Sequence, residues 1–216
     1  AADIIEMFGG NAVVELDDDG NYSVTLTDNV NGTVTLPENL GKVTLDLAGF
    51  EIVGTDGASG VPARDGSAAI VIRTPNCNPL NPQPIELTLK GEGRLVGGKG
   101  GNSLAENPLD GEKGGDGAPA IANKTWSADT VDIVVTLDGP TLRGGHGGKG
   151  RDALTGNGGP GGRGGDAVGA GIVIDYISGR ARGGDGGEGG ETRDKTATAR
   201  GGNGGRGGDA NLRDED

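Results

Sequence analysis

Three stretches in the second half of the chain follow a strict Gly-Gly-X period, and this period limits the fold more than any other feature. They are "NGGPGGRGGD" (157–166), "RGGDGGEGGE" (182–191) and "RGGNGGRGGD" (200–209). A left-handed polyproline-II-like helix has three residues per turn and no internal hydrogen bonds, so its glycine edges allow other backbones to approach closely. Each ordered glycine costs about 0.5–1 kcal/mol relative to alanine, so such tracts need lateral packing. The period therefore predicts ordered, laterally hydrogen-bonded glycine tracts, with Pro160 and Arg163 on an outward edge.

Two further patterns recur at long intervals and predict β-strands. The first pattern is apolar-x-apolar-x-Gly, a gap, then apolar-x-Gly; it occurs at 45–54, 87–98 and 135–145, with a degraded copy at 177–184. The second pattern occurs at 67–72, 118–123 and 169–174, and its isoleucines Ile70, Ile121 and Ile172 recur every 51 residues. Two strand types at a fixed period indicate a solenoid in which successive coils stack.

The expected fold is therefore all-β, a parallel β-helix solenoid with inserted polyglycine-II-like tracts and almost no α-helix. Residues 1–41 would form an N-terminal β cap, and residues 42–216 would form the coils of a single elongated domain. Strands 43–47, 86–89 and 133–137 should stack in one parallel sheet. Strands 69–72, 119–122 and 171–174 should stack in another.

The charge of the chain limits its partners. The formal net charge is −13 and the pI is near 4.5, which disfavours nucleic acid and anionic membranes because both require a basic footprint. No run is long enough for a membrane span. Cys77 is the single cysteine, so an internal disulfide framework is excluded. This acidic, cysteine-poor composition favours an extracellular or cell-surface protein.

Calcium is an alternative explanation for part of the pattern, although no cofactor is expected. "GGKGRDALT" (147–155) and "GGRGGDAVG" (161–169) match the nonapeptide of calcium β-rolls, which makes Asp152 and Asp166 candidate ligands. The two copies start 14 residues apart instead of nine, so they do not build shared sites. Asp17, Asp19 and Asn21 partly resemble an EF-hand loop, but Tyr22 stands where glycine is required. An acidic turn is the better interpretation.

The sequence contains no recognisable catalytic constellation. His146, the single histidine, lies in "GGHGG" without a nucleophile motif around it. We therefore expect no enzymatic activity. The candidate binding residues are the indole of Trp126 and the charged X residues Arg163, Asp166, Asp185, Glu188 and Arg206.

The chain resembles known proteins in two ways. "VTLDLAGFEIVG" (43–54), "GSAAIVI" (66–72) and "LTLKGEGRLVGG" (87–98), with "GGKGG" and "GGDGGEGG" inserted, resemble Gly-rich right-handed parallel β-helices of the pectate-lyase-like type in bacterial surface proteins. The glycine tracts are similar to those of phage tail-fibre tip adhesins. The lyases' calcium-binding aspartates and catalytic arginine have no matching residues here. The first resemblance implies surface display and no defined activity.

These observations predict a non-enzymatic extracellular surface module, structural or adhesive, that displays rows of charged residues to a surface glycan or a protein receptor. The alternatives are a phage-type receptor-binding tip and a polysaccharide lyase or hydrolase of the β-helix class. A groove with clustered carboxylates and basic residues would support the lyase or hydrolase.

Overall fold

The computed structural model describes residues 2–37, 40–73, 85–104, 111–124, 133–196 and 198–210. Helix α1 (Ala2–Met7) precedes strands β1 (Ala12–Leu16), β2 (Tyr22–Leu26), β3 (Val30–Asn31), β4 (Val34–Leu36), β5 (Lys42–Asp46) and β6 (Glu51–Val53). The later strands are β7 (Ile70–Arg73), β8 (Ile85–Lys90), β9 (Arg94–Val96), β10 (Ile121–Lys124), β11 (Ile133–Arg143) and β12 (Ile172–Arg182). The all-β class with almost no helix is confirmed.

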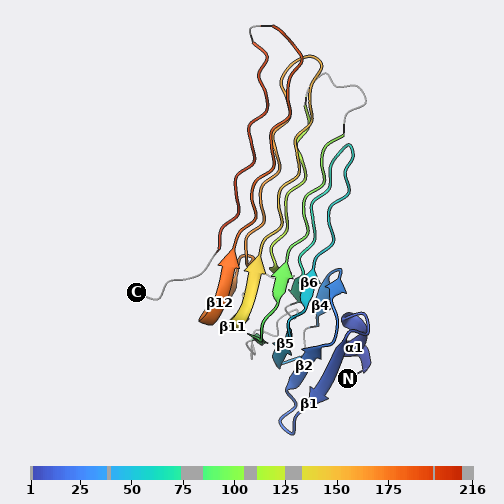
Figure 1. The fold of residues 1–216 in the computed structure, drawn as a ribbon, viewed down its shortest axis with the longest axis vertical. Coiled ribbons are helices and arrows are strands. Elements are labelled where there is room, and N and C mark those ends of the chain that lie inside the picture. Colours follow the sequence, from blue (N-terminus) through green and yellow to red (C-terminus); the bar gives the residue numbers. More distant parts are fainter. Residues whose placement is uncertain are drawn as a thin grey trace, which may run out of the picture.

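The strands form two sheets, from which long glycine tracts run away side by side (Figure 1). The larger sheet has nine strands in the order β1-β2-β5-β8-β11-β9-β6-β3, with β12 paired to β11. It curls back because the first half of β11 pairs with β8 and its second half with β9. Gly139, with a φ of 112°, lies between the two halves. The smaller sheet is β10-β7-β4 and is parallel throughout.

The predicted parallel β-helix solenoid is wrong. The large sheet is a mixed, curled half-barrel, in which β1 pairs antiparallel with β2 while the other pairings are parallel. The alternation of apolar residues fixes which segments are strands and which of their faces are buried. It carries no information on how the strands are distributed between sheets or how far a sheet curls, and these are decided by pairing and packing.

Part of the predicted strand stacking is correct. Segments 43–47, 86–89 and 133–137 lie in one parallel ladder, and Ile70 pairs with Ile121 in the other sheet. The third copy is misplaced, because Ile172 pairs with Ile133 in the large sheet and Val168 makes the isolated bridge to Ile121. The degraded copy at 177–184 continues as the second half of β12, where Arg180 pairs with Thr141.

The inward-facing aliphatic residues of both sheets form the hydrophobic core. Leu45, Leu89 and Leu137 are adjacent in register and are fully buried. At the N-terminal end, α1 covers the core with Ile4, while Phe8, just beyond its last turn, is completely buried. Among the helices in the described ranges, none has the length and apolar character needed to cross a bilayer.

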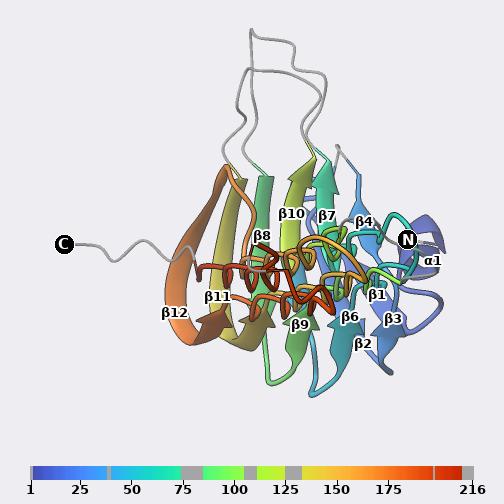
Figure 2. The same ribbon diagram turned by 90° about the horizontal axis from the view of Figure 1, so that it is seen from above.

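The glycine segments form two layers of extended tracts, seen end-on in Figure 2. We call the tracts that leave the sheet outgoing, and they comprise residues 54–60, 97–104, 144–153 and 183–192. The tracts that come back are called returning, and they comprise residues 62–67, 111–118, 157–167 and 200–209. Hydrogen bonds between neighbouring tracts recur at every third residue, as the Gly-Gly-X period predicts.

Candidate functional site

The two glycines of each Gly-Gly-X unit have different hydrogen-bond partners. The first glycine donates within its own layer to the carbonyl of an X residue on the next tract, as Gly147 does to Asp185 at 2.9 Å. The second glycine donates across to the other layer, as Gly162 does to Gly148 at 2.8 Å. The glycines of the internal tract 157–167 are buried, whereas Pro160 and Arg163 are exposed. The period therefore places the X side chains on the outside of a hydrogen-bonded slab.

The X residues also hydrogen bond to each other from tract to tract. Their own N–H groups are not used by the glycine ladder, and an X side chain of the preceding tract accepts many of them. Asp116 Oδ1 accepts from the Arg163 N–H at 2.7 Å, and Asp166 Oδ1 accepts from the Asp209 N–H at 2.8 Å. The same contact is made by Asp56 to Lys99, Asn102 to Lys149, Asp152 to Glu191 and Asn157 to Arg200. These contacts fix the lateral register of the X rows.

Oppositely charged X residues pair along several of the tracts. Arg163 Nη2 lies 2.9 Å from Asp166 Oδ1, and Lys149 Nζ lies 3.3 Å from Asp152 Oδ1, in both cases three residues apart. Arg206 and Asp209 are 3.6 Å apart in the same way. Exposed pairs of this kind contribute at most about 1 kcal/mol each, so they orient the side chains more than they stabilise the fold.

The predicted binding residues fall into two groups on opposite layers. Arg163, Asp166 and Arg206 lie on returning tracts, and the Gly164 N–H donates to the Arg206 carbonyl, which makes Arg163 and Arg206 neighbours in one row. Asp185 and Glu188 lie on the last outgoing tract, where Asp185 contacts Arg182 at 3.3 Å. Trp126 lies outside the described residues, as does Cys77.

The candidate metal ligands hold turns and tracts together. Asp17 accepts hydrogen bonds from the side chain and backbone of Asn21 and from the backbone of Asp19, and these bonds lower its pKa. The pKa of Asp152 is lowered mainly by the backbone N–H of Glu191. Among the residues that the structure describes, no three His, Cys, Asp or Glu side chains cluster as a metal site would require.

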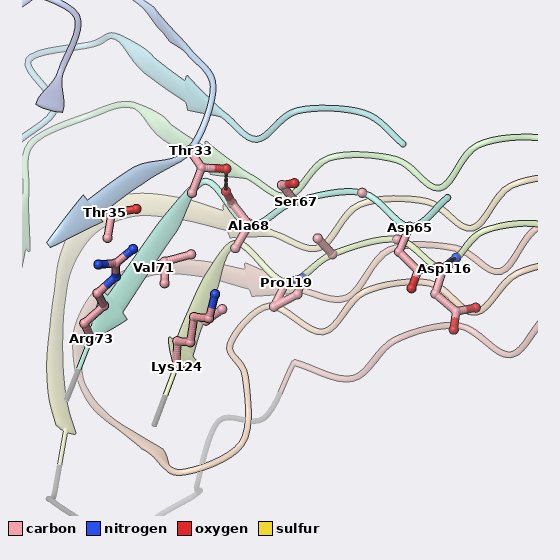
Figure 3. Close-up of a pocket in the computed structure, with 14 residues that line it drawn as sticks. Thr33, Thr35, Asp65, Ser67, Ala68, Val71, Arg73, Asp116, Pro119 and Lys124 are labelled. Atoms are coloured by element: carbon pink, nitrogen blue, oxygen red, sulfur yellow. Dashed lines mark hydrogen bonds between the residues drawn. The ribbon is translucent and has the colours of Figure 1, made fainter. Parts of the chain in front are cut away.

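A groove that the sequence patterns did not reveal crosses the outer face of the small sheet (Figure 3). Its volume is about 500 Å³, and its floor includes Val71 and Ala122. Arg73 and Lys124 are paired in register at one end, whereas Asp65 and Asp116 lie at the other. Arg73 and Lys124 are separated by the same 51 residues as Ile70 and Ile121, so the predicted stacking of these two strands could already have shown that the two cations are in register.

The charges in this groove have structural partners on the acidic side. The Asp116 N–H donates to Asp65 Oδ1 at 2.7 Å, and Lys113 lies against the Asp116 carboxylate. Burial alone would raise the pKa of Asp116, but the hydrogen bonds from Lys113 and from the Arg163 N–H outweigh it and lower the pKa. The carboxylates of Asp65 and Asp116 are thus engaged in the tracts and lie at the opposite end of the groove from Arg73 and Lys124.

Comparison with protein-family models, curated proteins and solved structures found no match to this chain.

Proposed function

We propose that the protein is a non-enzymatic surface module, structural or adhesive, that displays rows of charged side chains to a receptor outside the cell. The observation that carries this proposal is the lateral register of the X residues. Hydrogen bonds from the glycines hold the backbone, and side-chain acceptors such as Asp116 and Asp166 hold one X row against the next.

A preorganised array of this kind suits a repetitive ligand. Arg163 and Arg206 are exposed and adjacent in one row across two tracts. Along the outermost returning tract, the exposed side chains of Arg200 and Asn203 occupy consecutive X positions. Because the backbone is already ordered, binding does not need to fix it, and less conformational entropy is lost on association. A surface glycan with regularly spaced charges or a protein receptor fits this display.

The test is a binding screen of the whole chain against neutral, sialylated and sulfated glycans and against matrix proteins. The variants are Arg206→Glu and Glu188→Lys, which reverse an exposed X charge on each of the two layers. Neither native side chain accepts the N–H of a neighbouring X residue, so both substitutions leave the hydrogen bonds between tracts in place. Matched controls are Glu15→Lys and Lys90→Glu, which reverse exposed charges on strands. We expect a ligand whose binding falls at least fivefold in one tract variant and is unchanged in both controls. Absence of any ligand, or equal effects in tract and control variants, would contradict the adhesive role.

A further inference from the structure

The last two tracts, 183–190 and 201–208, form an open edge with unused backbone groups. In the preceding outgoing tract, Gly144, Gly147 and Gly150 donate to X carbonyls of the next tract, but their equivalents Gly183, Gly186 and Gly189 have no backbone acceptor among the described residues. The carbonyls of Gly159, Gly162 and Gly165 accept from Gly190, Gly187 and Gly184, whereas their equivalents Gly202, Gly205 and Gly208 accept from no described residue. Three donors of the outgoing tract and three acceptors of the returning tract therefore line this edge at three-residue intervals. The N–H groups of Gly201, Gly204 and Gly207 are three further donors with no backbone acceptor among the described residues.

The same edge has room for another backbone. A Cβ added to Gly158, Gly161 or Gly164 would lie 2.0–2.1 Å from a carbonyl oxygen of the neighbouring tract. At the equivalent Gly201, Gly204 and Gly207 the nearest atom is 3.6 Å away. Glycine thus stands at three open positions where nothing in the described chain requires it, despite its entropic cost. A further tract packed here would require it.

The apolar end of the large sheet is uncovered on the same side. Among the strands that the structure describes, β12 pairs with β11 alone, and Tyr176 is 53% exposed although its register partner Leu137 is fully buried. Ile177 beside it is 62% exposed. An unpaired edge strand with exposed apolar residues is a template for pairing with another chain. The opposite end of the core, by contrast, is covered by Ile4 and Phe8.

A second copy of this chain stacked head to tail does not complement the open edge. The edge that would have to meet it, the first outgoing tract, carries Thr55 and Ala58 in the places equivalent to Gly98 and Gly101. At those glycines an added Cβ would lie 2.0–2.2 Å from carbonyl oxygens of the preceding tract. The occupant must instead carry glycine at the second position of each unit.

The charges on the open edge indicate which charge the X residues of the occupant should carry. Asp185, Glu188 and Glu191 are the X residues of the outgoing tract that faces it, and all three are exposed. Elsewhere, an acidic X residue accepts the N–H of a basic X residue on the next tract, as Asp56 does from Lys99 and Asp116 does from Arg163. Basic X residues on the occupant would therefore lie beside these three acidic side chains and be attracted to them.

We propose that the open edge binds a basic Gly-Gly-X segment of a partner polypeptide. Its X carbonyls accept hydrogen bonds from Gly183, Gly186 and Gly189, and its second glycines donate to the carbonyls of Gly208, Gly205 and Gly202. Residues that precede the segment cover Tyr176 and Ile177. This interface is separate from the outward X rows proposed above to meet a receptor.

The test uses a labelled acetyl-(Gly-Gly-Lys)₄-amide peptide and the whole chain, with binding followed by fluorescence anisotropy. The matched peptides are (Gly-Ala-Lys)₄, which places a methyl group against the carbonyls of Gly184 and Gly187, and (Gly-Gly-Glu)₄, which reverses the charge. The variant is Gly204→Val, whose Cβ would lie on the open edge at an ordinary van der Waals distance, 3.6 Å, from the nearest atom, the Gly187 carbonyl oxygen. Its control is Asn203→Val, at the exposed X position beside it.

We expect (Gly-Gly-Lys)₄ to bind at least tenfold more tightly than either matched peptide. Gly204→Val should lose at least tenfold in affinity while keeping its melting temperature, and Asn203→Val should bind as the unmodified chain does. No binding of (Gly-Gly-Lys)₄, equal binding of (Gly-Ala-Lys)₄, or unchanged binding by Gly204→Val would overturn the proposal. So would a dimer in light scattering that Gly204→Val dissociates, because a second copy would then occupy the edge. Gly204→Val leaves the outward X residues in place, so glycan binding is scored independently.

Discussion

Replacing Gly162 with alanine should destabilise the protein strongly, although it adds only one methyl group. The new Cβ would lie 1.9 Å from the Gly115 carbonyl oxygen, so tracts 111–118 and 157–167 must separate. Their separation breaks the hydrogen bonds from Gly114 to Pro160 and from Gly117 to Arg163, at 3.0 and 2.8 Å. The N–H groups of Gly114 and Gly117 then lack an acceptor, which costs about 1–3 kcal/mol for each, and the stiffer unfolded chain returns about 0.4–1 kcal/mol. The net loss is on the order of 3 kcal/mol, which lowers Tm by about 6–12 °C in a chain of this length.

The control is the same substitution at Gly204, on the open edge, where the nearest atom to the added Cβ is 3.6 Å away. Gly204→Ala should be neutral or stabilising by up to about 1 kcal/mol, because alanine restricts only the unfolded chain. Thermal and urea unfolding by circular dichroism measure both variants. Equal changes in the two variants would refute the conclusion that packing between tracts requires glycine.

Three further predictions concern acid, metal and the N-terminal end. Hydrogen bonds lower the pKa values of four carboxylates, those of Asp17, Asp116, Asp152 and Asp194. Their ionised forms therefore stabilise the fold at pH values above the unfolded pKa of about 3.9. This stability is lost as the pH falls through the lower pKa values of the folded state. Urea midpoints should therefore fall between pH 5 and pH 2, and less so in Asp116→Asn, which keeps an acceptor oxygen but cannot titrate. EDTA should leave Tm nearly unchanged; a drop above about 10 °C would reveal a structural calcium site. Phe8→Ala should cost about 3–5 kcal/mol in urea unfolding, because Phe8 is fully buried; a loss under about 1 kcal/mol would show that it does not close the core.

Local patterns in the sequence predict the strands, their buried faces and the positions where glycine is packed. The alternation in "KVTLDL" and "IELTLK" predicts strands with Leu45 and Leu89 inward, because side chains on a strand point to opposite faces in turn. The Gly-Gly-X period predicts that Gly161 and Gly162 face other backbones while Arg163 faces solvent, because a threefold helix places every third residue on one edge. Neither conclusion depends on how distant segments meet.

The pairing register of strands far apart in the sequence could be predicted from the sequence only in part. The sequence pattern aligns Leu45 with Leu87, but in the structure Leu45 pairs with Leu89, because the turn before Ile52 is longer than the turn before Leu95. A period-2 pattern looks the same after a shift of two residues, so it leaves this register open. The assignment of Ile172 to the small sheet failed because both strand types present the same apolar alternation.

Three features follow only from the folded chain: the curl of the large sheet, the groove between Arg73 and Asp116, and the open edge at Gly183 and Gly204. Each of these depends on which tract or strand lies beside which, and the backbone hydrogen bonds that join neighbours leave no signature in the local sequence. The partner of the Arg163 N–H illustrates the limit. Asp116 is 47 residues away in the sequence, and its carboxylate reaches that amide only because two glycine tracts with no side chains between them can lie in direct backbone contact.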